Sequence, residues 1–414
     1  MENKHVHSLL RSSVVLVVIA FASLLASCKQ DNSATTPVSI TPNNPTPANT
    51  SIPKAPTAIV YPADNPQSDA KVELGRHLFF DKQMSVDGST SCGSCHQLKH
   101  GLSDIFPTSQ GMQGQHGTRN APALANIAYN TAFTWDGRFE SLEKHAPGPI
   151  FNSLEMGNNF TSDPRLQDSV PSGYNSKPGS NDTLFLFKRL GGNESLTLRK
   201  DLNDNSYYDL LAKAWGPVKI TTDGGKTWNT KITFTMDIIA KSIAAYERTF
   251  ISTQSDFDKY NNGDQSVYKY NPEALHGFQL FTDVNGANCV SCHSGYNFTD
   301  QQYHDNGIGI NKEGDKGRFG ITKASSDVGK FKTPSLRNVA LTAPYMHDGH
   351  LATLESVLKN YNAGGVNSAN QDSKIKKLNL SDQDIADIIE FLKTLTDNNF
   401  VIDRGNKFGN PWGN

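Results

Sequence analysis

The sequence predicts a mainly α-helical fold in which two similar domains face each other, with long loops and few short strands. Three observations carry this prediction. The pattern Cys-x-x-Cys-His occurs once in each half of the 414-residue chain. Apolar residues near both motifs recur at helical spacing, and no long alternating strand pattern is present. The chain is rich in glycine (33) and proline (20), which indicates long loops between helices.

The N-terminus predicts an export signal followed by a lipid anchor. Residues 14–25 are almost wholly apolar, follow the positive charges of Lys4 and Arg11, and are too few to span a bilayer comfortably. The next stretch, Leu25-Ala26-Ser27-Cys28, fits a lipobox in which Cys28 becomes the lipidated first residue. An ordinary signal peptide that ends near a cysteine is the alternative. We expect residues 1–28 to be a lipoprotein signal peptide and residues 29–62, rich in Pro, Thr and Asn, to be a disordered tether.

The net charge and the hydropathy of the chain limit the classes of partner that it can bind. The formal net charge of −2 argues against nucleic acid, because phosphate binding needs a basic surface. No later segment is apolar enough to cross a membrane. We therefore expect a protein of the cell envelope, on the periplasmic side or at the surface, that meets the membrane only through its lipid.

The cysteines predict two covalently bound haem c groups. Apart from Cys28, they form two identical motifs: Cys92-Gly93-Ser94-Cys95-His96 and Cys289-Val290-Ser291-Cys292-His293. Two thiols on one helical turn reach the two vinyl groups of one porphyrin, and the adjacent histidine coordinates the iron. A redox dithiol does not need that histidine, and zinc would need the two motifs to converge on one metal. We expect each domain to be cytochrome-c-like, with no thiol left for a structural disulfide.

Periodic segments place helices around the motifs. Residues 74–80 and 276–281 are similar apolar leads into the two cysteine pairs, which suggests a duplicated domain. Residues 236–250 have helical spacing, and Ser381 begins another helix with an acidic first turn. A helix from Leu354 to Tyr361 stops at Gly364-Gly365. We expect an N-terminal haem domain over 63–250 with a loop insertion at about 160–205, a C-terminal haem domain over 251–402, and a tail over 403–414.

Several further blocks resemble the bacterial dihaem cytochrome c peroxidases and the related MauG-type enzymes. In chain order these are Leu74-Gly-Arg-His-Leu-Phe-Phe-Asp81, the first haem motif, Arg119-Asn-Ala-Pro122, Trp135-Asp-Gly-Arg138, Gly148-Pro149 with Glu155-Met156, the second haem motif, Thr333-Pro-Ser-Leu-Arg-Asn338 and Ala343-Pro-Tyr-Met-His-Asp-Gly349. The resemblance spans about residues 74–396. It implies a peroxidase whose first haem is the peroxide site and whose second haem passes electrons to it.

The resemblance assigns roles at the first haem. His96 is the proximal ligand, and Glu155 matches the distal acid–base that moves a proton between the two peroxide oxygens. A surface carboxylate is the alternative for Glu155. Trp135 matches the tryptophan between the haems, although it can also be an ordinary core residue. A distal glutamine of the family is replaced by His145, which either hydrogen-bonds peroxide or is an exposed loop histidine.

Two axial positions depart from the family pattern. Where many members carry a distal histidine that caps the first iron, this chain has Met112, and His116 is a candidate substitute. If neither binds, the first haem is open and needs no reductive activation. At the second haem His293 is the proximal ligand, and the usual distal methionine is replaced by Tyr361, as in MauG-type enzymes. Met346 is the competing ligand. A phenolate favours ferric iron, whereas a thioether raises the potential.

The resemblance also implies one calcium ion between the domains, at Asn120, Thr342 and Pro344.

The motifs and the resemblance lead to three hypotheses about function. The first is reduction of hydrogen peroxide to water with electrons from a small c-type cytochrome or a cupredoxin. The second is a MauG-like enzyme that oxidises Trp or Tyr of a partner protein through high-valent haem. The third is a non-enzymatic dihaem electron carrier. A homodimer is common in the family and is a further candidate assembly.

Overall fold

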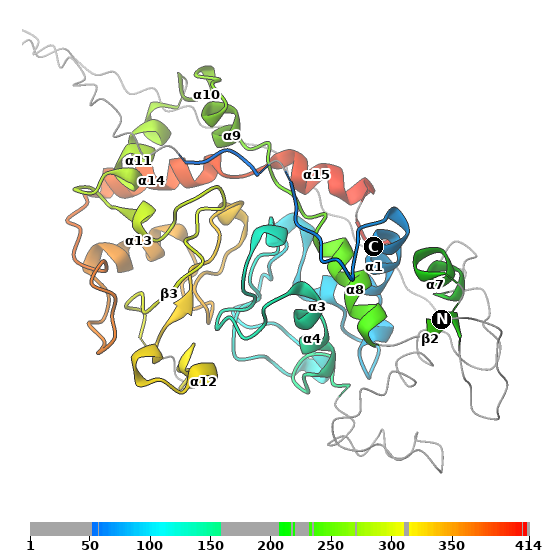
Figure 1. Cartoon of the computed structure of the whole chain (residues 1–414). Coiled ribbons are helices and arrows are strands. Elements are labelled where there is room, and N and C mark those ends of the chain that lie inside the picture. The colour runs from blue at the N-terminus through cyan, green and yellow to red at the C-terminus, as the bar shows by residue number, and fades with distance from the viewer. Residues whose placement is uncertain are drawn as a thin grey trace, which may run out of the picture. The chain divides into compact units, whose positions relative to one another are not determined.

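The computed structural model describes residues 52–56, 58–158, 207–216, 218–219, 232–233, 236–269, 271–309, 314–407 and 409–411. The fold is mainly helical, as predicted (Figure 1). Its strands are short: β1 (Val218–Lys219) pairs parallel with β2 (Ile232–Thr233), and β3 (Tyr303–His304) pairs antiparallel with β4 (Phe331–Lys332). Within the described ranges, no helix has the length and apolar character needed to cross a bilayer.

The first half of the chain contains six helices within the described residues. They are α1 (Asp69–Phe80), α2 (Cys92–Cys95), α3 (Leu142–His145), α4 (Pro147–Phe151), α7 (Tyr207–Trp215) and α8 (Met236–Glu247). Short 3-10 turns η1 (Lys82–Met84), η2 (Leu98–His100), η3 (Met112–Gly114) and η4 (Ile127–Tyr129) lie in the loops between them. The long connections around the first Cys-x-x-Cys-His motif therefore have little regular structure, which leaves their backbone free to line a cavity.

The first core forms where α1 crosses α8. Leu74, Leu78 and Phe79 of α1 are fully buried against the apolar face of α8. Gly75 permits the close approach, because a Cβ there would lie 1.9 Å from the carbonyl oxygen of Ser242. The sequence prediction of a helix over 236–250 is confirmed, with its end at Glu247.

The second half repeats this plan. Its helices are α9 (Asp256–Asn261), α10 (Ser266–Lys269), α11 (Pro272–Thr282), α12 (Phe319–Thr322), α13 (Leu354–Ala363), α14 (Asp382–Thr394) and α15 (Asn398–Lys407). The 3-10 turns are η6 (Cys289–Ser291), η7 (Ser325–Asp327) and η8 (Val339–Leu341). The predicted start of α14 is confirmed by a capping box between Ser381 and Asp384, and the predicted stop of α13 by Gly364 in the left-handed region at φ 91°.

The second core forms where α11 packs against α14. Phe257, Phe281, Phe298 and Phe391 are buried there with ring centroids 5.0–6.2 Å apart. A Cβ at Gly277 would lie 1.9 Å from the carbonyl oxygen of Asp387. Each haem motif is thus preceded by a helix that crosses a later helix at a glycine, which gives a structural reason for the weak repeat seen in the sequence.

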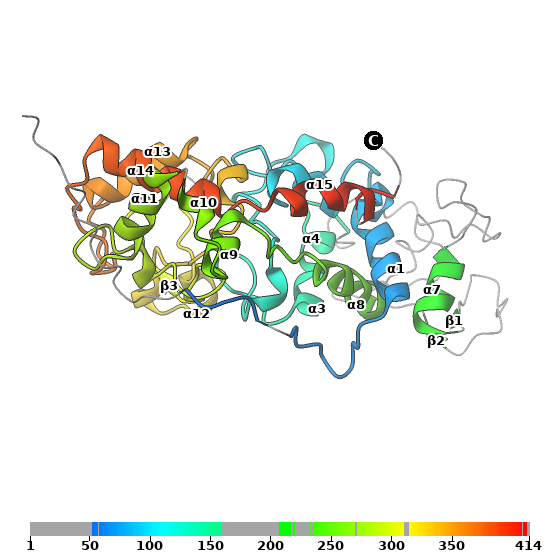
Figure 2. The ribbon, with the colours of Figure 1, turned by 90° about the horizontal axis from the view of Figure 1, so that it is seen from above.

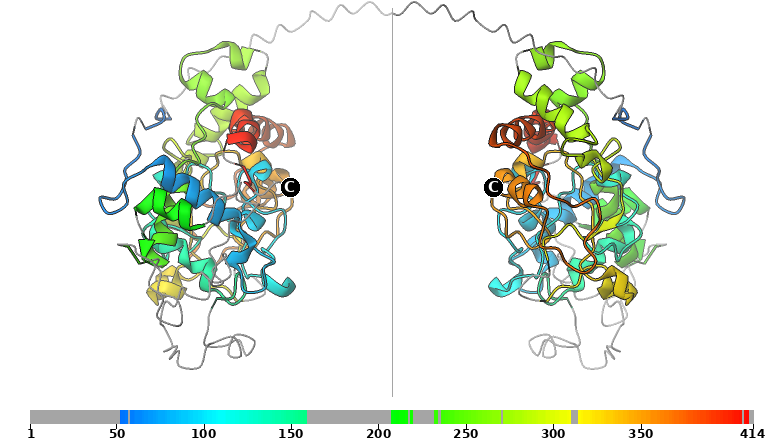
Figure 3. Two further views of the ribbon diagram at one scale, coloured as in Figure 1. Left: turned by 90° about the vertical axis from the view of Figure 1, so that its right-hand side faces the viewer. Right: turned by 90° about the vertical axis from the view of Figure 1, so that its left-hand side faces the viewer.

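The last helix connects the two cores. Figure 2 shows α15 running from the end of α14 back towards α1. Its Phe400 is buried in the first core, beside residues of α1 and α8. Figure 3 shows the segment with α9 and α10 beside the red C-terminal helices. There the Tyr268 hydroxyl of α10 and the Thr394 hydroxyl at the end of α14 are hydrogen-bonded at 3.0 Å.

Some predictions concern residues outside the described ranges. These are the signal peptide over 1–28 with Cys28, most of the tether over 29–62, the loop insertion at about 160–205 and part of the tail over 403–414. The described residues 52–56 and 58–62 of the proposed tether include Ile52, which is buried in the second core. The limits of the two domains stay a prediction.

Candidate haem pockets

The first Cys-x-x-Cys-His motif forms one helical turn, α2, as the spacing predicts. The Ser91 N–H donates to the Ser94 hydroxyl at 3.0 Å, which closes the start of the turn, and the His96 N–H donates to the Cys92 carbonyl at the other end. His96 Nδ1 lies 2.9 Å from the Leu102 carbonyl oxygen. That hydrogen bond fixes the tautomer with the proton on Nδ1 and leaves Nε2 free for a metal.

The second motif has the same construction on η6. The His293 N–H donates to the Cys289 carbonyl at 2.8 Å, and His293 Nδ1 lies 3.0 Å from the Phe298 carbonyl oxygen. Both histidines therefore present the same ring nitrogen to a cavity. We call the cavity lined by Cys92, Cys95 and His96 the first pocket, and the one lined by Cys289, Cys292 and His293 the second pocket.

The thiols suit covalent haem attachment better than the competing chemistries. All four are free. Burial raises the pKa of Cys92, and it raises those of Cys95 and Cys289 to about 12. A redox dithiol needs an accessible thiolate of low pKa, and a zinc site built from both motifs would need them at one metal, whereas they line two different cavities. Two thiols on one turn beside an iron-directed imidazole, in each of two cavities, fit a c-type haem in each pocket.

Polar groups gather in the first pocket, where the resemblance expects peroxide. Glu155 follows α4, and its Oε1 accepts a hydrogen bond from Asn152 Nδ2 at 2.6 Å. Burial raises the pKa of Glu155. His145, at the end of α3, stacks on Phe133 at 6.1 Å between ring centroids and contacts Phe139 edge-on at 5.5 Å. Both Glu155 and His145 line the first pocket, together with Arg138.

His145 is half-buried, lies at the end of α3 and lines this pocket, so it does not sit on an exposed loop. Burial, followed by the nearby His96 and Arg138, lowers its pKa to about 3. The imidazole is therefore neutral at physiological pH. Its Nδ1 is buried and has no hydrogen-bond partner among the described residues. A neutral imidazole that lines the first pocket is able to hydrogen-bond a small ligand or water.

Neither candidate cap reaches the first pocket. The Met112 side chain is buried beside Gly157, where an added Cβ would lie 2.1 Å from Met112 Sδ. His116 pairs with Gln110 in an isolated β-bridge, and its Nδ1 lies 3.4 Å from the Thr108 carbonyl oxygen. Neither residue is among the described residues that line the pocket. The proposal that one of them caps the first iron has no geometric support in this conformation.

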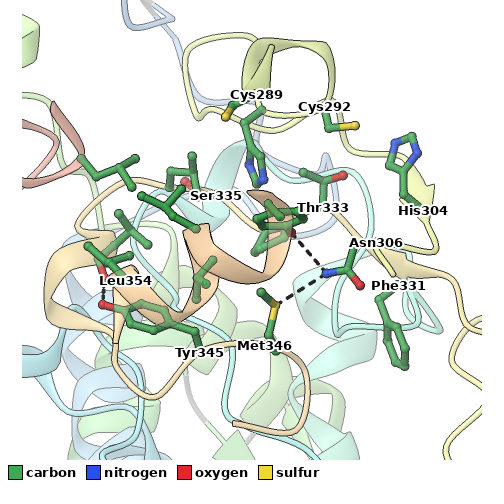
Figure 4. Close-up of a pocket in the computed structure, with 18 of the residues that line it drawn as sticks. Cys289, Cys292, His304, Asn306, Phe331, Thr333, Ser335, Tyr345, Met346 and Leu354 are labelled. Carbon is green, nitrogen blue, oxygen red and sulfur yellow. Dashed lines mark hydrogen bonds between the residues drawn. The ribbon is translucent and has the colours of Figure 1, made fainter. Parts of the chain in front are cut away.

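Both candidate axial ligands line the second pocket. Tyr361 comes from α13, which also contributes Leu354, Val357 and Leu358, and burial raises the pKa of the tyrosine to about 12. Met346 comes from the loop after η8 and has a left-handed backbone at φ 76°. Asn306 contacts both: its Nδ2 lies 3.2 Å from the Tyr361 hydroxyl and 3.6 Å from Met346 Sδ. Figure 4 shows the Asn306 amide directed towards Met346.

The two pockets meet at Trp135. This residue lines both, together with Asn120, Ala121 and Pro122. Trp135 Nε1 donates to the Asn120 carbonyl at 2.9 Å, and the Trp135 carbonyl accepts from the Lys332 N–H at 2.8 Å. The indole is thus held by the first half of the chain, and the Trp135 backbone by the second.

The residues expected to bind calcium also gather here. Asn120, Thr342 and Pro344 all line the second pocket near Trp135. The Asn120 N–H donates to the His347 carbonyl at 2.7 Å, which joins the loop before Trp135 to the loop after η8. Amide, hydroxyl and carbonyl oxygens are suitable ligands for a hard cation. The calcium site itself remains a proposal.

Three functional candidates escaped the sequence interpretation. Asn306 contacts the two ligand candidates. Lys332 is buried in the second pocket, where burial lowers its pKa to about 8. Glu247 is 3% exposed and lines the first pocket. The ends of α8 and β4 hold Glu247 and Lys332, yet nothing in the local pattern distinguishes them from surface charges.

Comparisons with known proteins agree with this arrangement. Residues 69–266 match the family described as di-haem cytochrome c peroxidase, and residues 274–396 match the cytochrome c family. The methylamine utilization protein MauG of Methylorubrum extorquens is 31% identical over 83% of this chain and 82% of its own. Cytochrome c551 peroxidase of Nitrosomonas europaea is 31% identical over 81% of this chain and 82% of its own. A similar fold is found in the crystal structure of a MauG-like protein associated with microbial copper homeostasis, with a TM-score of 0.69 and 29% sequence identity. The match covers 88% of this chain and 99% of that protein.

Proposed function

Because this chain belongs to the di-haem cytochrome c peroxidase family, which has MauG proteins among its relatives, we propose that it is a dihaem c-type peroxidase. It reduces hydrogen peroxide to water with electrons from a small c-type cytochrome or a cupredoxin. His96 and His293 hold the two irons, and the four motif cysteines carry the porphyrins.

The asymmetry of the two pockets is the observation that carries this proposal. The first pocket has proton-handling groups, Glu155 and His145, and neither Met112 nor His116 lines it. The second pocket has two side chains able to ligate iron, Tyr361 and Met346, within reach of one amide. This difference favours an open first site that meets a small substrate and a closed second site that only transfers electrons.

The chain's own groups account for the proton steps. Reduction of one peroxide takes up two electrons and two protons and yields two water molecules. When bound, the haems supply the electrons. Glu155 accepts the proton of one peroxide oxygen and delivers it to the other, so that the leaving oxygen departs as water. Asn152 holds the carboxylate at 2.6 Å, and neutral His145 hydrogen-bonds the peroxide or a water beside it.

The proposal also includes a bound ion, a lipid anchor and a dimer. A calcium ion bound by Asn120, Thr342 and Pro344 would join the loops that hold Trp135. Lipidation of Cys28 and a tether over 29–62 would hold the enzyme at a membrane of the cell envelope, and a homodimer is its proposed assembly. These proposals rest on the sequence and on the resemblance.

The test follows absorption spectra of the holoprotein, purified without its lipid, through stoichiometric peroxide addition and through turnover with a reduced cytochrome. We expect Glu155→Gln to lower the rate constant for reaction with peroxide by about 10²–10⁴-fold. Glu140→Gln is the matched control, because that carboxylate is exposed and its one ion pair among the described residues is with Lys144 of the next turn. Equal rates in Glu155→Gln and Glu140→Gln would exclude the catalytic role. If the first haem binds neither peroxide nor cyanide in any redox state, the protein is an electron carrier.

A second function is favoured by one specific observation. Tyr361 lies in the second pocket with its hydroxyl hydrogen-bonded to Asn306, and a tyrosine ligand stabilises oxidised iron. This is the arrangement expected of a MauG-like enzyme that oxidises Trp or Tyr of a partner protein. Such an enzyme would react with peroxide in the diferric state, hold its oxidising equivalents for long times and turn over a reduced cytochrome poorly. A requirement for prior one-electron reduction would instead favour the peroxidase.

A further inference from the structure

We propose that Asn306 is a positioning residue that selects the axial ligand of the second haem: it donates one hydrogen bond to Tyr361 and one to Met346, which makes the phenolic oxygen the ligand and withholds the thioether sulfur. This inference rests on the proposed function, because it assumes a haem attached at Cys289 and Cys292 with His293 as its proximal ligand.

The first step of the argument is that two ligand atoms compete for one position. Tyr361 reaches the second pocket from α13 and Met346 from the loop after η8, so they come from different segments. A single Asn306 nitrogen lies 3.2 Å from the tyrosine oxygen and 3.6 Å from the methionine sulfur. His293 occupies one axial side of the iron, so only one of the two atoms can take the other.

The second step is that Asn306 presents its donor edge to both. Its side-chain oxygen accepts from the Ile308 N–H at 3.4 Å, which assigns the NH₂ group to the side of the ligands. An amide NH₂ has two protons, one for each neighbour. Figure 4 shows the Asn306 nitrogen directed into the pocket, towards the Met346 sulfur.

The third step is that the backbone around Asn306 is tied down. Asp305 is 3% exposed, and its carboxylate accepts from the Gly307 N–H at 3.0 Å and from the Ser368 hydroxyl at 2.5 Å. His304 lies between two carboxylates, 2.8 Å from Asp300 and 2.6 Å from Asp372. These contacts fix the backbone on both sides of Asn306, and the bond from the Ile308 N–H to the Asn306 side-chain oxygen orients the amide.

The fourth step is that the two hydrogen bonds have opposite effects on ligation. A phenolic oxygen has lone pairs to spare, and a donor near it stabilises the anionic form that binds iron. A thioether is a weak acceptor, and a proton directed at its sulfur occupies the electron pair that iron would need. The same amide therefore favours Tyr361 and disfavours Met346, with the consequence of a lower potential at the second haem.

The experiment compares the holoprotein with Asn306→Leu, a variant of similar volume without donors. We expect Asn306→Leu to lose the phenolate charge-transfer signature of the ferric second haem and to gain that of a methionine-ligated ferric haem. Its reduction potential should shift upward, because thioether ligation favours ferrous iron. The double variant Asn306→Leu with Met346→Leu should lose the methionine signature again. Asn306→Asp, which keeps the shape but offers acceptors, should change the spectrum in the same direction as Asn306→Leu.

Asn370→Leu is the matched control. The Asn370 amide also donates two hydrogen bonds in the second half, to the carbonyls of Ser325 and Val328, so its loss perturbs the fold without touching a ligand. An Asn306→Leu spectrum and potential identical to those of Asn370→Leu would overturn the proposal, as would a wild-type spectrum that Tyr361→Phe leaves unchanged. Peroxide turnover, measured separately, reports on the proposed function and is not used for this decision.

Discussion

At the scale of single residues, two side chains of the first pocket differ in what they do with a proton. Burial lowers the pKa of His145 to about 3, so the imidazole stays neutral throughout the physiological range. Burial raises the pKa of Glu155, in spite of the Asn152 hydrogen bond and the Arg138 charge that lower it. Glu155 is consequently the one of the two whose protonation state changes as the pH rises from acid towards neutral.

This difference predicts the acidic limb of the pH profile. A base must be ionised to accept a proton, so reaction with peroxide should become faster as the pH rises through the pKa of Glu155, at a midpoint above the ordinary carboxyl value of 4.5. Stopped-flow mixing with peroxide over about pH 4–9 measures it. The rise of the rate with pH should remain in His145→Gln and disappear in Glu155→Gln. If the rate of Glu155→Gln still rises with pH, the titrating group is another residue.

Glu247 predicts a pH dependence of stability. Burial raises its pKa from 4.5 to about 8, and the charge that could compensate it, Arg248, pairs with Glu143 at 2.7 Å. The folded state therefore retains this proton between the two pKa values, where the unfolded chain has lost it. This retained proton makes a favourable contribution to the free energy of unfolding. The contribution is fully present below pH 4.5 and is lost as the pH rises to about 8.

Glu247→Gln removes the ionisable group without changing its shape. The free energy of unfolding of the variant should fall less steeply than that of the wild type across this window, so the difference between the proteins grows in favour of the variant with rising pH. Thermal unfolding of both holoproteins at several pH values measures it. Parallel curves would show that Glu247 is ionised in the folded protein.

At the scale of elements, local signals predicted some helices well. The apolar face of α8, the Ser381 capping box of α14 and the Gly364 stop of α13 each depend on residues within a few positions of one another. The Cys-x-x-Cys-His turns belong to the same class, because their spacing alone specifies a turn of helix and a haem. Glu155, Tyr361 and Trp135 needed the family resemblance, since no local pattern separates them from core or surface residues.

The loops around the haem motifs could not be predicted in this way. Asn126 and Asn338 both adopt the left-handed region just before a 3-10 turn, and both side chains bind the Ser252 segment between the two halves. Thr134 and Met346 repeat the left-handed backbone one position before Trp135 and His347. The contacts of Asn126 and Asn338 join residues more than 80 positions apart, which leave no periodic trace in the sequence.

Arg337 tests one such long-range connection. Its guanidinium is 1% exposed, pairs with Asp258 of α9 at 2.7 Å and donates to the Tyr296 carbonyl at 2.9–3.0 Å. Arg337→Leu leaves a buried carboxylate unpaired and should lower the free energy of unfolding by about 3–5 kcal/mol. Lys259→Met on the same helix removes only an exposed ion pair and should cost less than about 1 kcal/mol. Equal losses in the two variants would mean that Asp258 finds another partner.

At the scale of the whole molecule, the two halves are joined at the point where the pockets meet. Arg119 binds Asp136 in the first half and Asp315 in the second, at 2.6 Å to each. Trp135, the neighbour of Asp136, is held through its indole by Asn120 and through its carbonyl by Lys332. In the proposed peroxidase, electrons that enter at the second haem would cross this junction to reach the first pocket, and the indole lines both pockets.

Trp135→Phe tests this path. The smaller ring keeps an aromatic group but loses the Nε1 hydrogen bond to Asn120 and leaves a gap between the pockets. We expect electron transfer from the second haem to the first to slow severalfold after rapid mixing of the reduced protein with peroxide, while the ferric spectra of both haems stay unchanged. Trp215→Phe is the matched control, because its indole binds Ser242 on α8 and lines neither pocket. If both variants transfer electrons at the wild-type rate, the path runs through other atoms and Trp135 serves only to pack the junction.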